Sequence, residues 1–252
     1  MKDLDKHKKI AVLIDADNAQ HTKLKLILDE LSTHGHIVVK RAYGDWSSEY
    51  LKNWRTPLNE LAVQPVQQFA YTVGKNATDA AMIIDAMDLL YSDKFDAFAL
   101  VSSDSDFTRL AARLRESEVF VFGVGQEKTP ASFRNSCDRF ILTENLGSSD
   151  SGDVSEPVES EKGIQVISSE QERNSQIISL LRMGWKTYQD EAGWANVAAV
   201  GSFVKRSKPD FDPRSYGAAK ITEIISQFNH TFEVKRCTGK GGGVIVVFKP
   251  VA

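Results

Sequence analysis

Val101-Ser102-Ser103-Asp104-Ser105-Asp106-Phe107 joins the apolar run of residues 95–100 to residues 108–114, whose apolar side chains recur at helical spacing. The first pattern is typical of a buried strand and the second of an amphipathic helix. Two carboxylates, Asp104 and Asp106, therefore lie where a strand is followed by a helix. In open α/β sheets, ligand sites form at the carboxyl ends of the strands. This motif predicts such a sheet and a functional site at its edge.

The same order of strand, acidic residues and helix occurs at the start of the chain. The apolar run of residues 10–14 precedes Asp15, Asp17 and Asn18, and a helical pattern follows. Further strands are expected at residues 37–43, 66–70 and 119–124, and further helices at 47–62, with a break at Pro57, and at 79–92. Strands that alternate with helices predict the α/β class, with a mostly parallel sheet covered by helices on both faces.

The charge is unevenly distributed along the 252 residues. Residues 1–145 carry 18 basic and 21 acidic groups, whereas residues 169–252 carry 12 and 8. The segment between them is acidic, rich in serine and poor in apolar groups, a composition that does not offset the entropy of ordering. We therefore predict a first domain over residues 1–146, a flexible acidic linker over 147–168 and a second domain over 169–252.

The second domain has the pattern of a small winged helix-turn-helix. Helical spacing recurs over residues 177–185, 194–203 and 213–228, and two strands, 232–237 and 244–248, flank a glycine-rich turn. Three helices followed by a β-ribbon are typical of this fold. Its net positive charge suits a phosphate backbone.

Two features bear on the compartment. Cys137 and Cys237 do not suggest a disulfide framework. The first apolar run is too short for a signal peptide, and no run of about 20 apolar residues could span a membrane. The sequence predicts a cytoplasmic protein without a membrane segment.

The acidic residues at the predicted strand ends suggest a metal site. Asp15 and Asp104 end neighbouring strands if the first and fourth strands pair, and Asp79 opens a helix that can start beside them. Clustered carboxylates repel one another unless a cation lies among them, and oxygen ligands favour Mg²⁺ or Mn²⁺. Such an ion can activate water against a phosphodiester. The alternative is that each Asp only caps a helix or closes a turn.

Several ordered motifs in residues 8–145 resemble those of NYN domains, which belong to the PIN-like nucleases. They are Val12–Asn18, Gly74–Asp79 and Val101–Phe107, together with Tyr43–Trp46 and Ser132–Phe140. The resemblance implies a Mg²⁺- or Mn²⁺-dependent ribonuclease in which Asp15, Asp79 and Asp104 are metal ligands. It also implies that Asp106 is a further ligand or supports one, and that Asn18 positions substrate. The role of Asp17 is left open.

Residues 169–250 are similar to the OST-HTH, or LOTUS, domain, which is associated with RNA or protein binding. The similarity rests on residues 193–202 and 209–217 and on Phe232-Glu233-Val234 with the glycine-rich turn. It implies that one helix and the wing face a ligand, with RNA-binding candidates Arg214, Tyr216, Lys220, Lys235, Arg236 and Lys240. The alternative places Tyr216 in the core and leaves the lysines as a solvated face.

Three residues near the acidic motifs are additional substrate-binding candidates. Tyr43 and Trp46 follow a predicted strand end and could stack on a base of single-stranded RNA. Lys75 precedes the second acidic motif. For Tyr43 and Trp46, packing over the edge of the site is the alternative.

The sequence favours a ribonuclease, with endonucleolytic cleavage expected, over two other functions. One is a non-catalytic RNA-binding or scaffold protein with the same fold. The other is a phosphatase of the haloacid-dehalogenase kind, because Asp15 and Asp17 after a strand imitate its nucleophile and acid. A protein partner for the second domain and a homodimer also stay open.

Overall fold

The computed structural model describes residues 8–69, 77–147, 162–238 and 243–251, with the backbone alone for residues 162–170. The chain forms two compact units, which meet in the sequence between Ser148 and Ser149. Of the predicted linker, residues 148–161 lie outside the described residues, and a helix begins at Lys162, within the range predicted as linker.

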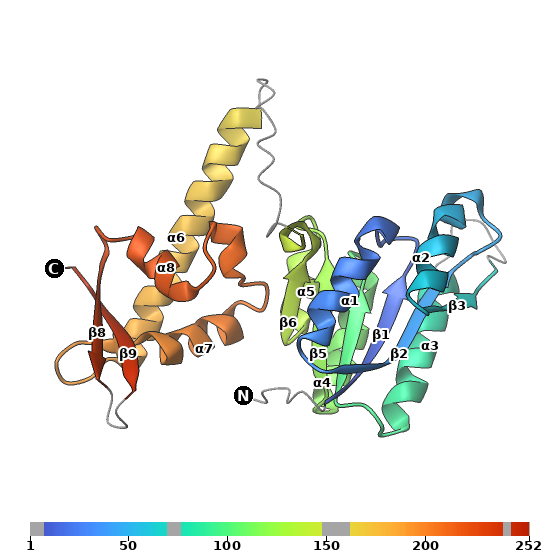
Figure 1. The fold of residues 1–252 in the computed structure, drawn as a ribbon, viewed down its shortest axis with the longest axis horizontal. Coiled ribbons are helices and arrows are strands. Elements are labelled where there is room, and N and C mark those ends of the chain that lie inside the picture. Colours follow the sequence, from blue (N-terminus) through green and yellow to red (C-terminus); the bar gives the residue numbers. More distant parts are fainter. Residues whose placement is uncertain (1–7, 70–76, 148–161, 239–242, 252) are drawn as a thin grey trace. The chain divides into compact units, whose positions relative to one another are not determined.

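The first unit is built on a six-stranded sheet in which every pairing is parallel. The order of its strands is β3-β2-β1-β4-β5-β6 (Figure 1). The strands are β1 (Lys9–Asp15), β2 (His36–Gly44), β3 (Gln64–Gln67), β4 (Ala97–Val101), β5 (Phe120–Gly125) and β6 (Arg139–Leu142). Continuous apolar runs form β1 and β4 because both faces of these central strands are buried.

Helices cover both faces of this sheet, which confirms the predicted fold class. Leu24 and Trp54 pack on one face and Met82 and Leu110 on the other. The first face carries η1 (His21–Lys23), α1 (Leu24–Ser32), η2 (Glu49–Trp54) and α2 (Arg55–Glu60). The second carries α3 (Ala77–Tyr91), η3 (Ser105–Phe107), α4 (Thr108–Glu116) and α5 (Ala131–Ser136), and η4 (Thr143–Asn145) follows β6.

Pro57 does not break the helical segment, contrary to the prediction. It lies in the first turn of α2, directly after the 3-10 helix η2. A proline is tolerated in the first turn because its missing N–H would have no partner within the helix. The change of helix type at Trp54 and Arg55, rather than the proline, divides this segment.

The strand order places the acidic motifs side by side. The chain adds β2 and β3 on one side of β1 and then returns, so that β4 pairs with the other side of β1. This is a topological switch point, where the carboxyl ends of two strands open a crevice. Ile14 pairs with Val101, so Asp15 and Ser102 follow at adjacent positions. The predicted pairing of the first and fourth strands is confirmed.

The second unit is a helical domain with a small antiparallel sheet. A core of buried side chains, including Ile177, Val200, Ile224 and Phe248, joins its helices to the sheet, whose order is β7-β9-β8. Its elements are α6 (Lys162–Tyr188), β7 (Ala195–Asn196), α7 (Val197–Ser207), η5 (Pro213–Tyr216), α8 (Ile221–Gln227), β8 (Phe232–Thr238) and β9 (Val244–Pro250). None of the helices in the described ranges has the length and apolarity that crossing a membrane requires.

The third helix predicted for this domain is two separate elements. Gly217 ends η5 with a left-handed backbone, φ 65°, and α8 begins only after Lys220. Glycine adopts this conformation without the steric cost of a Cβ atom, so it terminates a helix that hydrophobic spacing alone would continue. Trp194 likewise precedes a helix rather than lying within it, because Asn196 caps α7.

Candidate functional site

Three carboxylates converge beside the end of β4. Asp79 lies in the first turn of α3, Asp104 follows β4 and caps η3, and Asp106 lies in η3. Each offers one oxygen atom, and these three oxygens lie within 4.8 Å of one another. Asp79 and Asp104 are half-buried and Asp106 is exposed. The group therefore has a solvent-facing side and a side set against the protein.

Asp15 lies deeper, at the end of β1, and its carboxylate is held by hydrogen bonds. It is fully buried, and its Oδ2 accepts from Ser102 Oγ at 2.7 Å and from Asn18 Nδ2 at 2.8 Å. Its Oδ1 accepts from the backbone amides of Asp17 and Asn18 at 3.1 and 3.3 Å. Asn18, predicted to position substrate, thus donates to Asp15.

Ser102 connects Asp15 with the third acidic motif. Its hydroxyl donates to Asp15 and accepts a hydrogen bond from the Asp104 amide at 3.0 Å. The residue is 1% exposed, so this hydroxyl is shielded from water. Ser102 was not among the predicted site residues, and its position two residues before Asp104, at the end of a strand expected beside the first, is the signal that could have identified it.

Asp17 joins the first motif to the start of α3. Its carboxylate accepts a hydrogen bond from the Thr78 side chain, next to Asp79 in the sequence. Burial raises the pKa of Asp17, and the charge of Asp45, which follows β2, raises it further. Asp17 is therefore a structural link between two motifs that are more than 60 positions apart.

The pKa of Asp79 reflects both its burial and the nearby acidic groups. Burial raises its pKa to about 6, with further contributions from the negative charges of Asp15, Asp104, Asp106 and Asp17, in that order. Like charges disfavour ionisation of one another, and a cation placed among them relieves this repulsion. Three carboxylates with only oxygen donors fit a hard divalent ion such as Mg²⁺ or Mn²⁺.

Tyr43 does not fit the predicted stacking role. Its side chain is fully buried, and its hydroxyl donates to the carboxylate of Asp85, which also pairs with Arg41 at 2.5 Å. Burial, followed by the hydrogen bond to Asp85, raises the pKa of Tyr43, so the hydroxyl stays protonated. Its ring packs in the core between the sheet and α3, whereas the alternative interpretation placed it over the edge of the site.

Trp46 is half-buried at the same end of the sheet. Its ring nitrogen donates to the Val66 carbonyl at 3.0 Å, and its ring meets that of Trp54 edge-on, with centroids 6.4 Å apart. The indole therefore packs against the first core cluster. Lys75, the remaining substrate-binding candidate of this domain, lies outside the described residues.

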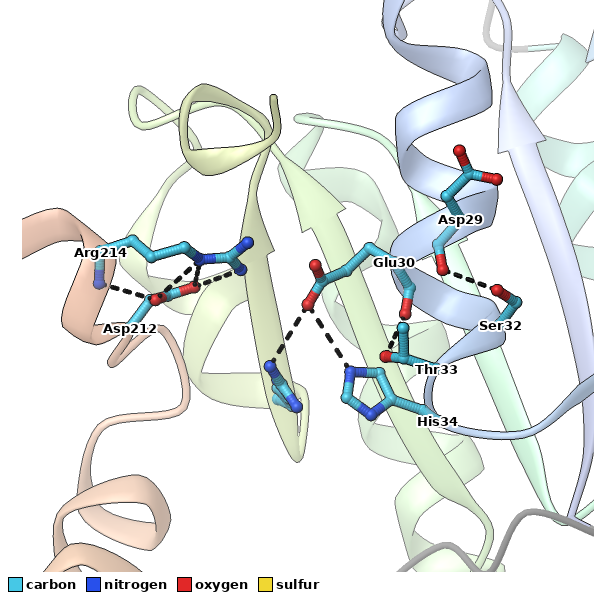
Figure 2. A network of polar contacts seen from close by, with 8 residues as sticks. Asp29, Glu30, Ser32, Thr33, His34, Asp212 and Arg214 are labelled. Carbon is cyan, nitrogen blue, oxygen red and sulfur yellow. Dashed lines mark hydrogen bonds and ion pairs between the residues drawn. The ribbon is translucent and has the colours of Figure 1, made fainter. Parts of the chain in front are cut away.

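In the second unit, the residues predicted on the ligand-facing helix have local partners. The Arg214 guanidinium pairs with Asp212, with Nη2 at 2.7 Å and Nε at 3.0 Å from Oδ2 (Figure 2). Tyr216 packs on Phe211, and burial raises its pKa to about 12. Lys220 is exposed at the start of α8. Arg214 and Tyr216 therefore have contacts within this unit.

Two of the three predicted wing residues lie on β8. Lys235 and Arg236 are exposed, and the Lys235 ammonium lies 5.6 Å from the centroid of the Trp194 ring. The Lys249 ammonium lies 4.7 Å from the same centroid. Lys240 falls outside the described residues. Trp194 and Lys249, which were not among the predicted binding residues, thus form a cluster with Lys235, which was.

Comparison with protein families matches the NYN domain to residues 9–145, more than half of the chain. This chain belongs to the NYN domain family. Residues 170–244 match the OST-HTH/LOTUS domain, so the two predicted family resemblances are confirmed. The NYN domain has a nuclease-like fold, and an OST-HTH/LOTUS domain implies RNA binding.

Individual relatives of this NYN protein are distant. An uncharacterised protein of Methanocaldococcus jannaschii is 28% identical over 123 residues, which make up 47% of this chain and 48% of the relative, so the chain spans about half the length of that relative. A protein of unknown function from Vibrio parahaemolyticus has a TM-score of 0.46 at 18% identity, covering 55% of this chain and 94% of that one. A fragment from Chromobacterium violaceum has a TM-score of 0.25 at 19% identity, covering 29% and 78%.

Proposed function

We propose that this NYN protein is a metal-dependent ribonuclease that hydrolyses phosphodiester bonds in RNA. The observation that carries the proposal is the convergence of Asp79, Asp104 and Asp106 at the topological switch point of a parallel sheet. The nuclease-like NYN fold and the RNA-binding family of the second unit support RNA as the substrate. Endonucleolytic cleavage in the cytoplasm is part of the proposal.

Asp79, Asp104 and Asp106 would hold Mg²⁺ or Mn²⁺. The buried carboxylate of Asp15 would add negative charge to the protein side of the site. When bound, such an ion lowers the pKa of water and neutralises charge on a phosphodiester. The chain itself holds the carboxylates in place through Ser102 and the Asp17–Thr78 hydrogen bond. The exposed side of the triad, at Asp106, would admit the RNA.

The second unit would hold the RNA while the first cleaves it. This division retains the proposed domains, residues 1–146 and 169–252, with residues 147–168 as the connection. The acidic first domain repels a polyanion and the basic second domain attracts it, so the tether would raise the local concentration of RNA near the site.

The two alternatives make different demands on the acidic residues. A phosphatase of the haloacid-dehalogenase kind would use Asp15 as a nucleophile, but this carboxylate is buried and accepts hydrogen bonds on both oxygens. A non-catalytic RNA-binding protein would not need to bury Asp79 among further carboxylates, an arrangement in which burial first and the neighbouring negative charges second raise its pKa to about 6. Both observations support the nuclease.

A cleavage assay tests the proposal. The full chain is incubated with single-stranded linear RNA and with circular RNA in Mg²⁺, in Mn²⁺ and in EDTA. We expect cleavage of both substrates only with a metal, and loss of cleavage in Asp104→Asn. The matched control is Asp88→Asn, which neutralises an exposed carboxylate farther along α3. Intact RNA with the wild-type chain in both metals would refute the proposal.

A further inference from the structure

One face of the small sheet in the second unit carries an aromatic ring between two lysines. Ala195 pairs with Phe248, and both side chains belong to the core. Because side chains alternate across a strand, Trp194, which precedes Ala195, faces away from that core. Lys249 follows Phe248 and faces outward for the same reason. We call this group of Trp194, Lys235 and Lys249 the tryptophan–lysine face.

The floor of this face is apolar and its rim is charged. Val247 pairs with both Asn196 and Lys235, so it lies on the outer side of the sheet, where it is only 8% exposed. The Lys235 and Lys249 ammoniums lie 5.6 and 4.7 Å from the Trp194 centroid. A cation at this distance is attracted to the indole face, so the cation–π interaction holds both ammonium groups beside the ring.

Hydrogen bonds hold the backbone directly before and after Trp194. The Trp194 amide donates to Asp190 Oδ1 and the Trp194 carbonyl accepts from the Asp190 amide, both at 2.8 Å. The Trp185 ring nitrogen donates to the carbonyl of Gly193 at 2.8 Å. A ring on such a support loses little conformational freedom when a ligand stacks on it.

We propose that the tryptophan–lysine face binds single-stranded RNA, with one base stacked on Trp194 and the flanking phosphates on Lys235 and Lys249. The inference rests on the proposed role of the second unit in binding RNA and deepens it. An indole offers a stacking surface to any base, and the ammoniums neutralise a phosphodiester backbone. Bases in a duplex are already stacked, so the strand must be single. On binding, the base takes the place of the ammoniums over the ring and they move to the phosphates.

The local partners of Arg214 and Tyr216 support the sheet face over the predicted helix. The Arg214 guanidinium is paired with Asp212, and Tyr216 packs on Phe211. On the sheet face, Lys249 pairs with Glu233 at 3.1 Å, an exposed contact that contributes little free energy and can exchange for a phosphate. The face keeps a net positive charge from Lys235.

Binding in EDTA tests this inference separately from cleavage. The full chain is titrated into a fluorescein-labelled 12-nucleotide RNA of mixed sequence, and anisotropy is read at several salt concentrations. We expect Trp194→Leu to weaken binding by about 5- to 150-fold, the range for one base stacked on an aromatic ring. Lys235→Gln should reduce the slope of log K against the logarithm of the salt concentration by about 0.7. Lys205→Gln, which removes an exposed charge at the end of α7, should change affinity less than about twofold.

A second measurement uses the unmodified chain, in case Trp194→Leu alters folding. RNA with 4-thiouridine is cross-linked by light and the adduct is mapped by mass spectrometry. We expect adducts at Trp194 or on β8. Adducts confined to η5 and α8, unchanged affinity in folded Trp194→Leu, or no RNA binding by the full chain would each overturn the inference. Because EDTA excludes metal, an inactive acidic site would not affect these results.

Discussion

The Ser102 hydroxyl donates a 2.7 Å hydrogen bond to the Asp15 carboxylate, although the two residues lie 87 positions apart in the sequence. The same hydroxyl accepts from the Asp104 amide, so one buried oxygen atom fixes the ends of both central strands. The acidic site is therefore held from inside the sheet as well as by its own turns.

Ser102→Ala should destabilise the first unit by about 1–3 kcal/mol, because the Asp15 carboxylate loses a donor and the Asp104 amide loses an acceptor in a buried place. Urea unfolding followed by circular dichroism measures the change. Ser105→Ala, at an exposed position at the start of η3, is the control and should stay within about 0.5 kcal/mol of wild type. Equal stability of the two variants would contradict the bridging role.

Asp79→Asn should stabilise the metal-free protein at pH 7. The pKa of Asp79 is about 6 in the folded protein against 3.8 as the ordinary value, so the folded state binds more protons between these values and its stability falls as pH rises through this window. Above pH 6 the ionised Asp79 lowers the stability of the folded wild-type protein by about 1 kcal/mol after solvent screening. Below pH 4 the variant should have no advantage. Thermal unfolding in EDTA at pH 4, 5, 6 and 7 measures the trend.

Adding Mn²⁺ at pH 7 should make the wild-type protein more stable than Asp79→Asn. A bound cation removes the repulsion in the wild-type site and stabilises the folded state by mass action, whereas Asp79→Asn has lost one ligand. We expect the wild-type Tm to rise with Mn²⁺ concentration and the variant's to rise less. Parallel rises in both proteins would show that the ion binds elsewhere.

Tyr43→Phe should lower stability and leave RNA affinity unchanged. The hydroxyl donates to Asp85 beside Arg41, and its loss leaves a half-buried carboxylate with one partner fewer, at a cost of about 1–3 kcal/mol. Tyr50→Phe, whose side chain is 94% exposed, is the matched control. Weaker RNA binding at unchanged stability would restore the stacking interpretation of Tyr43.

Gly125→Ala should disturb the acidic site from the neighbouring strand. A Cβ atom at Gly125 would lie 2.6 Å from the Ser102 carbonyl oxygen, which belongs to the backbone and cannot rotate away. We expect a loss of about 1–3 kcal/mol and reduced cleavage, measured by urea unfolding and the RNA assay. Gly201→Ala, where the added atom would meet only side-chain atoms of Ile221 at 3.6 Å, should be neutral or stabilising.

The sequence predicts the parallel sheet and the neighbourhood of the acidic motifs because both depend on local patterns. A short apolar run rich in β-branched residues, such as residues 10–14, favours a buried strand when turn signals follow it, and the carboxyl ends of parallel strands lie at one edge of the sheet. The proximity of the acidic residues at the ends of β1 and β4 can therefore be predicted without knowing where any side chain lies.

Side-chain contacts were less predictable because they depend on packing between distant elements. Tyr43 follows the same pattern whether its ring faces the core or the edge of the site, and only α3, with Asp85, decides between them. Likewise, the bonds of Ser102 and Thr78 exist only after their strands and helices are in place. Gly217 was visible in the sequence, but its positive φ was not.

The pairing of β1 with β4 has a consequence for the order of events during synthesis. Asp104 and Asp106 are made some 90 residues after Asp15, and β4 must insert beside β1 before their carboxylates can approach Asp79. A chain still attached to the ribosome, with β4 inside the exit tunnel, therefore has no assembled triad. If the protein cleaves RNA as proposed, messenger and ribosomal RNA close to the emerging chain would be protected from cleavage until most of the first domain has been released.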